Sequence, residues 1–296
     1  MKTKPSPVTI LLPTYNGAAF LPEQIASLKA QSCTDWHLIV SDDGSRDETV
    51  DLCARELSGA SWRLRSGPCR GVAANVLSSI LLVPYGHALA FCDQDDVWRP
   101  AKLERALTAL AACTGPAIYT SDRFVTRRDL SALRLDRRGT APFERLLWRG
   151  RAAGHTMVMN PQAASLLRRC VPETAPAFHD WWASLVLVGA GAHWIHDPEP
   201  TLLYRQHENN VLGASGGRLS RVMSGQYARW IRQNARVLDA ARPVLLPGAA
   251  RSLTRMQRLV GIGHLRGGRN ADMTGAQRAT RPRHHVQGFG EIWQQR

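Results

Sequence analysis

Residues 88–96, with the sequence ALAFCDQDD, join a continuous apolar run directly to three carboxylates. An apolar run without alternating polarity is typical of a strand that is buried on both faces, as in parallel sheets. Two further runs have this character, residues 8–12 (VTILL) and residues 37–41 (HLIVS), and the first is bounded by Pro7 and Pro13. The pattern predicts buried strands at all three places.

Segments with helical spacing alternate with these strands. In residues 21–31, for example, Leu21, Ile25 and Leu28 share one helical face. Strand–helix alternation in a chain of 296 residues, 44% of them hydrophobic, predicts an α/β domain. Its sheet is expected to be mainly parallel and Rossmann-like, with helices on both faces. Further helices are predicted at residues 47–57, 71–82 and 101–112, and a less regular pattern follows from 117 to 204.

Polar residues follow each predicted strand at its carboxyl end, where ligands gather in such sheets. These are Thr14 to Asn16, Asp42 with Asp43, and Asp93 to Asp96. Three carboxylates within four residues repel one another, and hard divalent cations such as Mg²⁺ or Mn²⁺ bind carboxylate and phosphate oxygens. One interpretation of the acidic cluster is therefore a metal–phosphate site, and the other is a solvated acidic turn.

Two downstream motifs are also open to a structural interpretation. His179-Asp180-Trp181-Trp182 is either a base beside a sugar-stacking platform or a helix start with two core tryptophans. In the segment YRQHENN, Arg205 is a candidate phosphate ligand and His207 a candidate metal ligand, although a lone histidine is more often structural.

The basic charge is concentrated at the end of the chain. Residues 214–296 contain 15 arginines and 3 acidic residues, whereas residues 1–213 contain 23 basic and 21 acidic residues. We therefore expect a domain at 1–213, a basic amphipathic helical extension at 214–266 and a disordered tail at 267–296. The six cysteines form no C-x-x-C pair, which favours free thiols.

Taken together, five segments resemble the family 2 glycosyltransferases, in particular their bacterial rhamnosyltransferase-like branch. They are VTILLPTYNGAAFLPEQIASLKAQ, WHLIVSDDGSRDET, FCDQDDVWRPAKL, HDWW and YRQHENNVLG, and they occur in the family's order and spacing over residues 8–213. The resemblance implies a GT-A fold and an inverting, metal-dependent transfer of a sugar from a nucleotide-sugar donor.

The resemblance also implies a role for individual residues. Asp180 is the expected catalytic base, and Asp93, Asp95 and His207 are the expected metal ligands. The role of Asp122, which matches a recurrent position, is not assigned. The expected donor-binding residues are Pro13, Thr14, Tyr15, Asn16, Asp42, Asp43, Asn75, Asp93 and Gln94.

The implied cofactors are Mn²⁺ or Mg²⁺ and a dTDP- or UDP-linked sugar, with rhamnose as the leading candidate. The implied acceptor is a cell-surface glycan or a lipid-linked acceptor. We expect a cytoplasmic protein, because no apolar run approaches the length of a membrane helix and an apolar strand follows the basic N-terminus. The basic extension either contacts an anionic membrane or packs on the domain with a solvated arginine face. Two rival hypotheses are a sugar nucleotidyltransferase and a nucleic-acid-binding protein that acts through the arginine-rich tail. The second leaves the acidic strand ends unexplained, so no nucleic-acid partner is expected.

Overall fold

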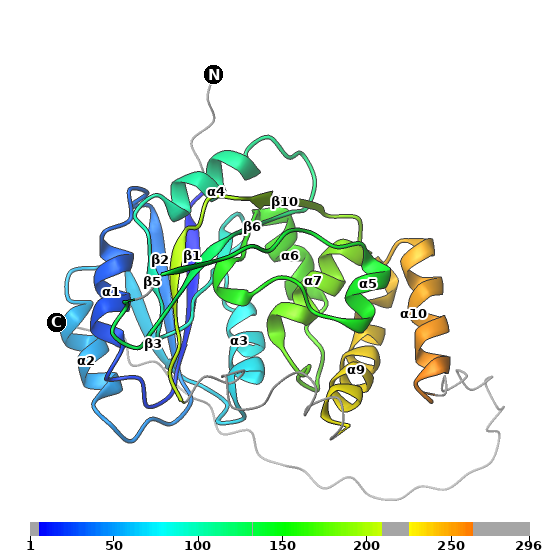
Figure 1. Ribbon diagram of the computed structural model, residues 1–296, viewed down its shortest axis with the longest axis horizontal. Helices are drawn as coiled ribbons and strands as arrows, with labels where there is room; N and C mark the ends of the chain where they lie inside the picture. Colours follow the sequence, from blue (N-terminus) through cyan, green and yellow to red (C-terminus); the bar gives the residue numbers. More distant parts are fainter. Residues whose placement is uncertain (1–5, 132, 209–224, 263–296) are drawn as a thin grey trace, which may run out of the picture. The chain divides into compact units, whose positions relative to one another are not determined.

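The central sheet of the computed structural model has seven strands in the order β10-β6-β9-β4-β1-β2-β3 (Figure 1). The strands β1 (Val8–Thr14), β2 (Trp36–Asp42) and β4 (Ala88–Phe91) are parallel neighbours, and β3 (Trp62–Ser66) continues the sheet beyond β2. On the other side, β9 (Val158–Met159) lies antiparallel between β4 and β6 (Ala117–Ser121), and β10 (His193–Asp197) pairs with β6 in parallel. The predicted mainly parallel α/β fold is confirmed.

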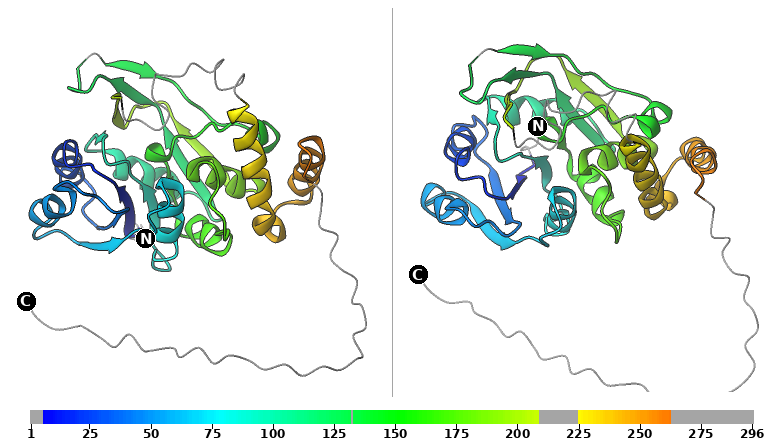
Figure 2. Two further views of the ribbon diagram at one scale, coloured as in Figure 1. Left: turned by 90° about the horizontal axis from the view of Figure 1, so that it is seen from below. Right: turned by 60° about the horizontal axis from the view of Figure 1, so that its bottom comes forward.

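Helices cover both faces of this sheet (Figures 1 and 2). The side chains of Val8, Ile10 and Leu12 enter one apolar core, and Leu11 enters the other. This division explains why β1 is apolar at consecutive positions, because both of its faces are buried. The first core includes α1 (Leu21–Lys29), α2 (Thr49–Glu56) and α4 (Lys102–Leu110), and the second includes α3 (Val72–Ile80), α5 (Phe143–Trp148), α6 (Pro161–Arg169) and α7 (His179–Gly189).

A second sheet, which the sequence pattern did not predict, lies beyond the acidic cluster. Its four strands have the order β5-β11-β7-β8, and they are β5 (Val97–Trp98), β7 (Arg123–Thr126), β8 (Arg134–Asp136) and β11 (Leu202–Arg205). Because β5 directly follows the acidic cluster and pairs with β11, this sheet fixes the far end of the acidic loop.

The last described helices pack against the α/β core. Among them, α9 (Gln226–Val237) places Tyr227 against Trp181 and Trp230 against Phe178, with ring centroids 6.1 and 4.8 Å apart. Next come η2 (Leu238–Val244) and α10 (Pro247–Leu259), and α10 lies beside α9 (Figure 2). The apolar face of the predicted amphipathic extension is thus buried against the domain.

The structure describes residues 6–131, 133–208 and 225–262, which belong to one compact unit. The predicted boundary at 213 and the predicted tail from 267 lie outside these residues. All six cysteines are free, as expected. In the part of the chain described, no helix combines the length and hydrophobicity needed to span a membrane.

Candidate active site

The carboxyl ends of β1, β2 and β4 lie side by side at one edge of the central sheet. Thr14 is in register with Asp42, and Thr14 Oγ1 donates a hydrogen bond of 2.8 Å to Asp42 Oδ1. Phe91 of β4 is in register with Leu11 of β1, so the acidic loop leaves the sheet beside the end of β1. The structure therefore brings together the three polar motifs that follow the predicted strands.

Asp42 and Asp43 hold the loops that border these strand ends. Asp42 Oδ2 accepts a hydrogen bond of 3.1 Å from the backbone N–H of Gly44, as in an Asx turn, and one of 2.8 Å from the N–H of Ser45. Asp43 accepts from the backbone N–H groups of Cys69 and Gly71 at 2.7 and 2.8 Å. Their contacts with a nucleobase and ribose stay predictions.

Gln94 joins the acidic loop to the loop after β1. Its side chain accepts from the N–H of Tyr15 at 2.9 Å and donates to the carbonyl of Tyr15 at 3.1 Å. A Cβ at Gly17 would overlap the end of the Gln94 side chain, so any larger residue there would displace Gln94. Asn16 adopts a left-handed backbone with φ of 46°, and the ring of Tyr15 is 55% exposed and accessible for base stacking.

Asn75 is placed differently from the other expected donor-site residues. Its side chain is 1% exposed, and its Nδ2 donates to the carbonyl of Ser41 at 2.7 Å, while Ser41 Oγ donates to Asn75 Oδ1. These contacts support the end of β2 from within the protein. Pro13 is a partly buried member of β1.

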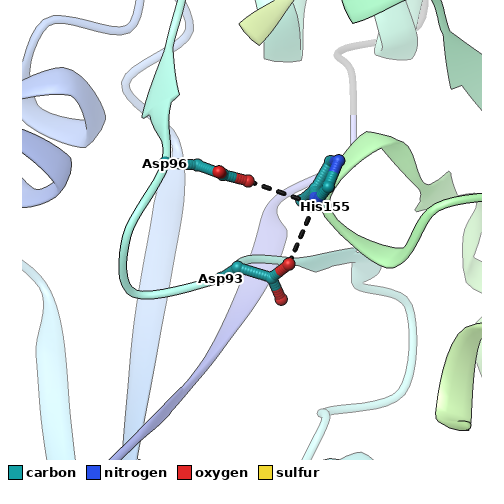
Figure 3. Close-up of side chains that lie close together, drawn as sticks. All are labelled: Asp93, Asp96 and His155. Carbon is teal, nitrogen blue, oxygen red and sulfur yellow. Dashed lines mark hydrogen bonds and ion pairs between the residues drawn. The ribbon is translucent and has the colours of Figure 1, made fainter. Parts of the chain in front are cut away.

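Two carboxylates of the acidic loop converge on a histidine that the sequence analysis missed (Figure 3). His155 Nδ1 lies 2.8 Å from Asp93 Oδ2 and 3.1 Å from Asp96 Oδ2. His155 belongs to the short helix η1 (Gly154–Thr156) that precedes β9, and both it and Asp96 are buried. The three side chains are close enough to hold a metal ion together. Only their proximity in space reveals His155, because a single histidine between glycine and threonine forms no motif.

The third carboxylate faces the other expected metal ligand. Asp95 Oδ2 lies 2.7 Å from His207 Nε2, and the ring of Phe20 stacks on His207 with centroids 4.4 Å apart. The structure therefore brings the predicted pair Asp95 and His207 together. Asp93, the third predicted metal ligand, contacts His155 instead.

Arg123, also missed, determines which nitrogen of His155 holds the proton. Arg123 Nη1 lies 2.6 Å from His155 Nε2, and Arg123 Nε donates to Asp136 Oδ2 at 2.9 Å. The guanidinium lies 4.0 Å from the centroid of the Tyr204 ring. Because a guanidinium only donates, Nε2 is the acceptor and the proton of the neutral imidazole is on Nδ1, facing Asp93.

The pKa shifts agree with this arrangement. Burial lowers the pKa of His155 to about 4, and the charge of Arg123 acts in the same direction, so the imidazole is neutral. Burial works to raise the pKa of Asp93, but the hydrogen bond with His155 and nearby positive charge hold it below its usual value. Burial, and then the neighbouring carboxylates, raise the pKa values of Asp95 and Asp96.

The acidic loop fits a hard divalent cation, because buried carboxylates that repel one another are stabilised by a cation between them. Asp95 and Asp96 show this crowding in their raised pKa values. The proton on Nδ1 argues against His155 as a ligand, since this nitrogen donates to Asp93. Among the described residues, the side chains within ligand distance of one another are Asp93, Asp96 and His155. The predicted set, Asp93 and Asp95 with His207, stays a prediction.

Asp180 lies in the first turn of α7, and Gly154 links it to the carboxylate cluster. Its Oδ2 accepts a hydrogen bond of 3.0 Å from the backbone N–H of Gly154, the residue before His155. The adjacent indoles of Trp181 and Trp182 are 4% and 0% exposed. Of the two interpretations of this motif, the structure favours a helix start with core tryptophans, and no sugar-stacking platform is formed.

Two further residues of the sequence motifs have structural contacts. Asp122 Oδ1 accepts from the N–H of Arg138 at 2.7 Å and lies 3.0 Å from His196 Nε2, which ties the two sheets together. The buried Arg205 of β11 donates from Nε to the backbone carbonyl of Asp95 at 3.0 Å and so fixes the backbone of the acidic loop.

Comparison with known proteins places this geometry among sugar-transferring enzymes. Residues 9–169 match the family model described as glycosyl transferase family 2. A dTDP-rhamnosyl transferase, RfbG of Shigella flexneri, is 25% identical over 214 residues, which is 68% of this chain and 73% of that protein. A UDP-Glc:alpha-D-GlcNAc-diphosphoundecaprenol beta-1,3-glucosyltransferase, WfgD of Escherichia coli, is 31% identical over 103 residues, but the match covers only 35% of this chain and 40% of that protein.

Solved structures show the same fold at low identity. The crystal structure of S. aureus TarS 1-349 superimposes with a TM-score of 0.58 at 13% identity, covering 85% of this chain and 71% of that chain. The mannosyltransferase PcManGT from Pyrobaculum calidifontis, in complex with GDP-Man and Mn²⁺, superimposes with a TM-score of 0.54 at 18% identity, covering 89% of this chain and 77% of that chain. The expected GT-A fold is confirmed.

Proposed function

Because the chain belongs to glycosyl transferase family 2, which confirms the expected glycosyltransferase, we propose that it moves a sugar, with inversion, from a nucleotide sugar to an acceptor hydroxyl. The observation that supports this most directly is the position of the acidic loop beside the ends of β1 and β2. Asp180 is hydrogen-bonded to Gly154, the residue before the histidine that contacts this loop. Rhamnose from a dTDP-linked donor is the leading candidate, since a similar protein is a dTDP-rhamnosyl transferase, and a UDP-linked donor is the second.

On the donor side, the residues around the strand ends would hold the nucleotide. Tyr15 presents its ring to the base, and Asp42 and Asp43 accept from base and ribose. Asp93 and Asp95, with His207, would hold Mn²⁺ or Mg²⁺. A divalent cation at that position would neutralise negative charge on the diphosphate leaving group.

On the acceptor side, Asp180 would act as the base. Its carboxylate accepts the proton of the acceptor hydroxyl while the hydroxyl oxygen forms a bond to the anomeric carbon. The bond to the diphosphate oxygen breaks on the opposite face, and the nucleoside diphosphate leaves with the bonding electron pair. The backbone N–H of Gly154 holds the carboxylate of Asp180 in place through its hydrogen bond to Oδ2.

Binding of nucleotide with and without Mn²⁺ tests the metal assignment. Asp95→Ala should lower the affinity for UDP or dTDP in the presence of Mn²⁺ by about tenfold or more, because one charge-assisted contact contributes about 1.5–3 kcal/mol. The affinity measured in EDTA should not change. An Asp95→Ala protein that binds nucleotide as the wild type does in both conditions would exclude Asp95 as a metal ligand.

The acceptor and the location are the remaining parts of the proposal. The proposed acceptor is a cell-surface glycan or a lipid-linked saccharide, and the proposed location is the cytoplasm. Contact with an anionic membrane would use the exposed arginines of α10, Arg251, Arg255 and Arg258, because the apolar face of α9 is buried. Sedimentation with anionic and neutral liposomes at low salt tests this contact, and equal recovery in both supernatants would exclude it.

A further inference from the structure

A positively charged segment wraps around the start of α7, next to the proposed base. Trp181 Nε1 donates to the carbonyl of Leu146 in α5 at 2.6 Å. A Cβ at Gly150 would come within 3.2 Å of Trp181 Cγ, and the N–H of Gly154 bonds Asp180. Residues 146–154 therefore follow the first turn of α7 closely and end at Asp180.

Three arginines lie within this segment or directly before it. Arg145 and Arg149 are exposed, and Arg151 is half-buried. Arg151 donates from Nε to the carbonyl of Gly139 at 3.3 Å and from Nη2 to the carbonyl of Arg138. The backbone N–H of Arg149 donates to the carbonyl of Arg145 at 3.1 Å, which places these two residues one helical turn apart at the end of α5. Burial lowers the pKa of Arg151, and the positive charges of Arg138, Arg145 and Arg149 lower it further, whereas the carboxylate of Asp136 acts to raise it.

Nearby carboxylates are occupied elsewhere. Asp136 forms ion pairs with Arg123 and Arg138 at 2.9 and 2.8 Å. Glu144 of α5 faces α10, where its Oε1 accepts from Ser252 Oγ at 3.0 Å. Within residues 6–131, 133–208 and 225–262, the arginines at 145, 149 and 151 form no ion pair.

Trp148 adds a flat apolar surface to this charged segment. Its side chain is 43% exposed, and its carbonyl accepts a hydrogen bond of 2.9 Å from Tyr227 Oη, which anchors the end of α5 on α9. An exposed indole beside arginines is suited to a ligand that joins an apolar or sugar part to an anionic group.

We propose that Arg145, Arg149 and Arg151 form an acceptor-side subsite for a phosphate or diphosphate group. The inference rests on the proposed function, because it uses Asp180 to define the acceptor side. Three arginines that form no ion pair among the described residues match a multiply charged oxyanion, which guanidinium groups bind with paired hydrogen bonds. The transferred sugar would then go to an acceptor that contains a phosphate ester close to the reacting hydroxyl.

Inorganic pyrophosphate tests this subsite on the full chain by calorimetry in EDTA, which prevents metal-dependent binding at the donor side. The wild type should bind pyrophosphate, and Arg145→Gln/Arg149→Gln should weaken binding by about tenfold per arginine. Arg151→Gln should also weaken binding, and comparison of melting curves separates this loss from unfolding. The control, Lys29→Gln/Arg55→Gln, removes the same charge from the exposed surfaces of α1 and α2 and should bind as the wild type does.

Three results would overturn the inference. The first is no pyrophosphate binding by the wild type, and the second is an equal loss of binding in the control variant of α1 and α2. The third is binding of the protein to anionic lipid vesicles without binding of pyrophosphate, which would indicate a membrane surface. UDP or dTDP binding with Mn²⁺, measured on the same variants, should not change. If nucleotide binding is absent in the wild type as well, the proposed function fails, and if it is retained while pyrophosphate binding is absent, only the subsite fails.

Discussion

Replacing His155 tests whether the buried chain of hydrogen bonds from Asp136 through Arg123 to Asp93 holds the acidic loop. His155→Leu removes the partner of the Arg123 N–H and of the Asp96 carboxylate, which are both buried, at a position where the histidine is 3% exposed. It also removes the contact with Asp93, whose side chain is 34% exposed and can be hydrated. A buried polar group left unsatisfied costs about 1–3 kcal/mol, so two groups cost about 4 kcal/mol. With roughly 2–4 °C per kcal/mol for a domain of this size, the melting temperature should fall by about 10 °C.

The assay is thermal unfolding followed by circular dichroism, with two companion variants. His155→Asn retains a donor near the position of Nδ1 but cannot reach Arg123, so it should lose about half as much stability. His193→Leu removes an exposed histidine from β10 and should melt close to the wild type. If His155→Leu melts within about 2 °C of the wild type, or if the Asn variant is no better than the Leu variant, the reasoning about this hydrogen-bond chain is wrong.

Two further variants test the loop contacts and the buried charge. Gly17→Ala should displace Gln94 from Tyr15 and lower nucleotide affinity about tenfold with little change in melting, and an unchanged affinity would separate this contact from nucleotide binding. Lys102 is fully buried, which lowers its pKa to about 7 in the folded protein, whereas the unfolded chain has the ordinary lysine pKa of about 10. Between these two pH values the unfolded state binds a proton that the folded state does not, so the free energy of unfolding falls as the pH drops from about 10 to 7. Lys102→Met should therefore gain more stability over the wild type at pH 7 than at pH 9.5 in urea unfolding, and an equal gain at both would contradict the shifted pKa.

The elements that could be predicted from sequence are those whose local pattern follows from their burial. The strands β1, β2 and β4 are apolar on consecutive residues because both faces are covered, and the acidic residues after β4 lie where the pattern placed them. The second sheet was not predicted, because strands such as β5 and β8 have two and three residues and form only through pairing with distant segments.

The site could be predicted only where its functional residues are close together in the sequence. Asp93, Asp95 and Asp180 belong to compact motifs, whereas His155 and Arg123 are single residues that meet the acidic loop through tertiary packing. The indoles of Trp181 and Trp182 had two interpretations in the sequence, and only their burial decides between them.

The most direct test of the proposed reaction compares the wild type with Asp180→Asn, using Mn²⁺, dTDP-rhamnose or UDP-sugars, and a mixture of lipid-linked saccharides as acceptors. The wild type should release nucleoside diphosphate and form a glycoside of inverted configuration. Asp180→Asn should bind the nucleotide as well as the wild type does and transfer no sugar, because its amide cannot accept the proton. Release of pyrophosphate by the wild type, or transfer by Asp180→Asn at the wild-type rate, would contradict the account.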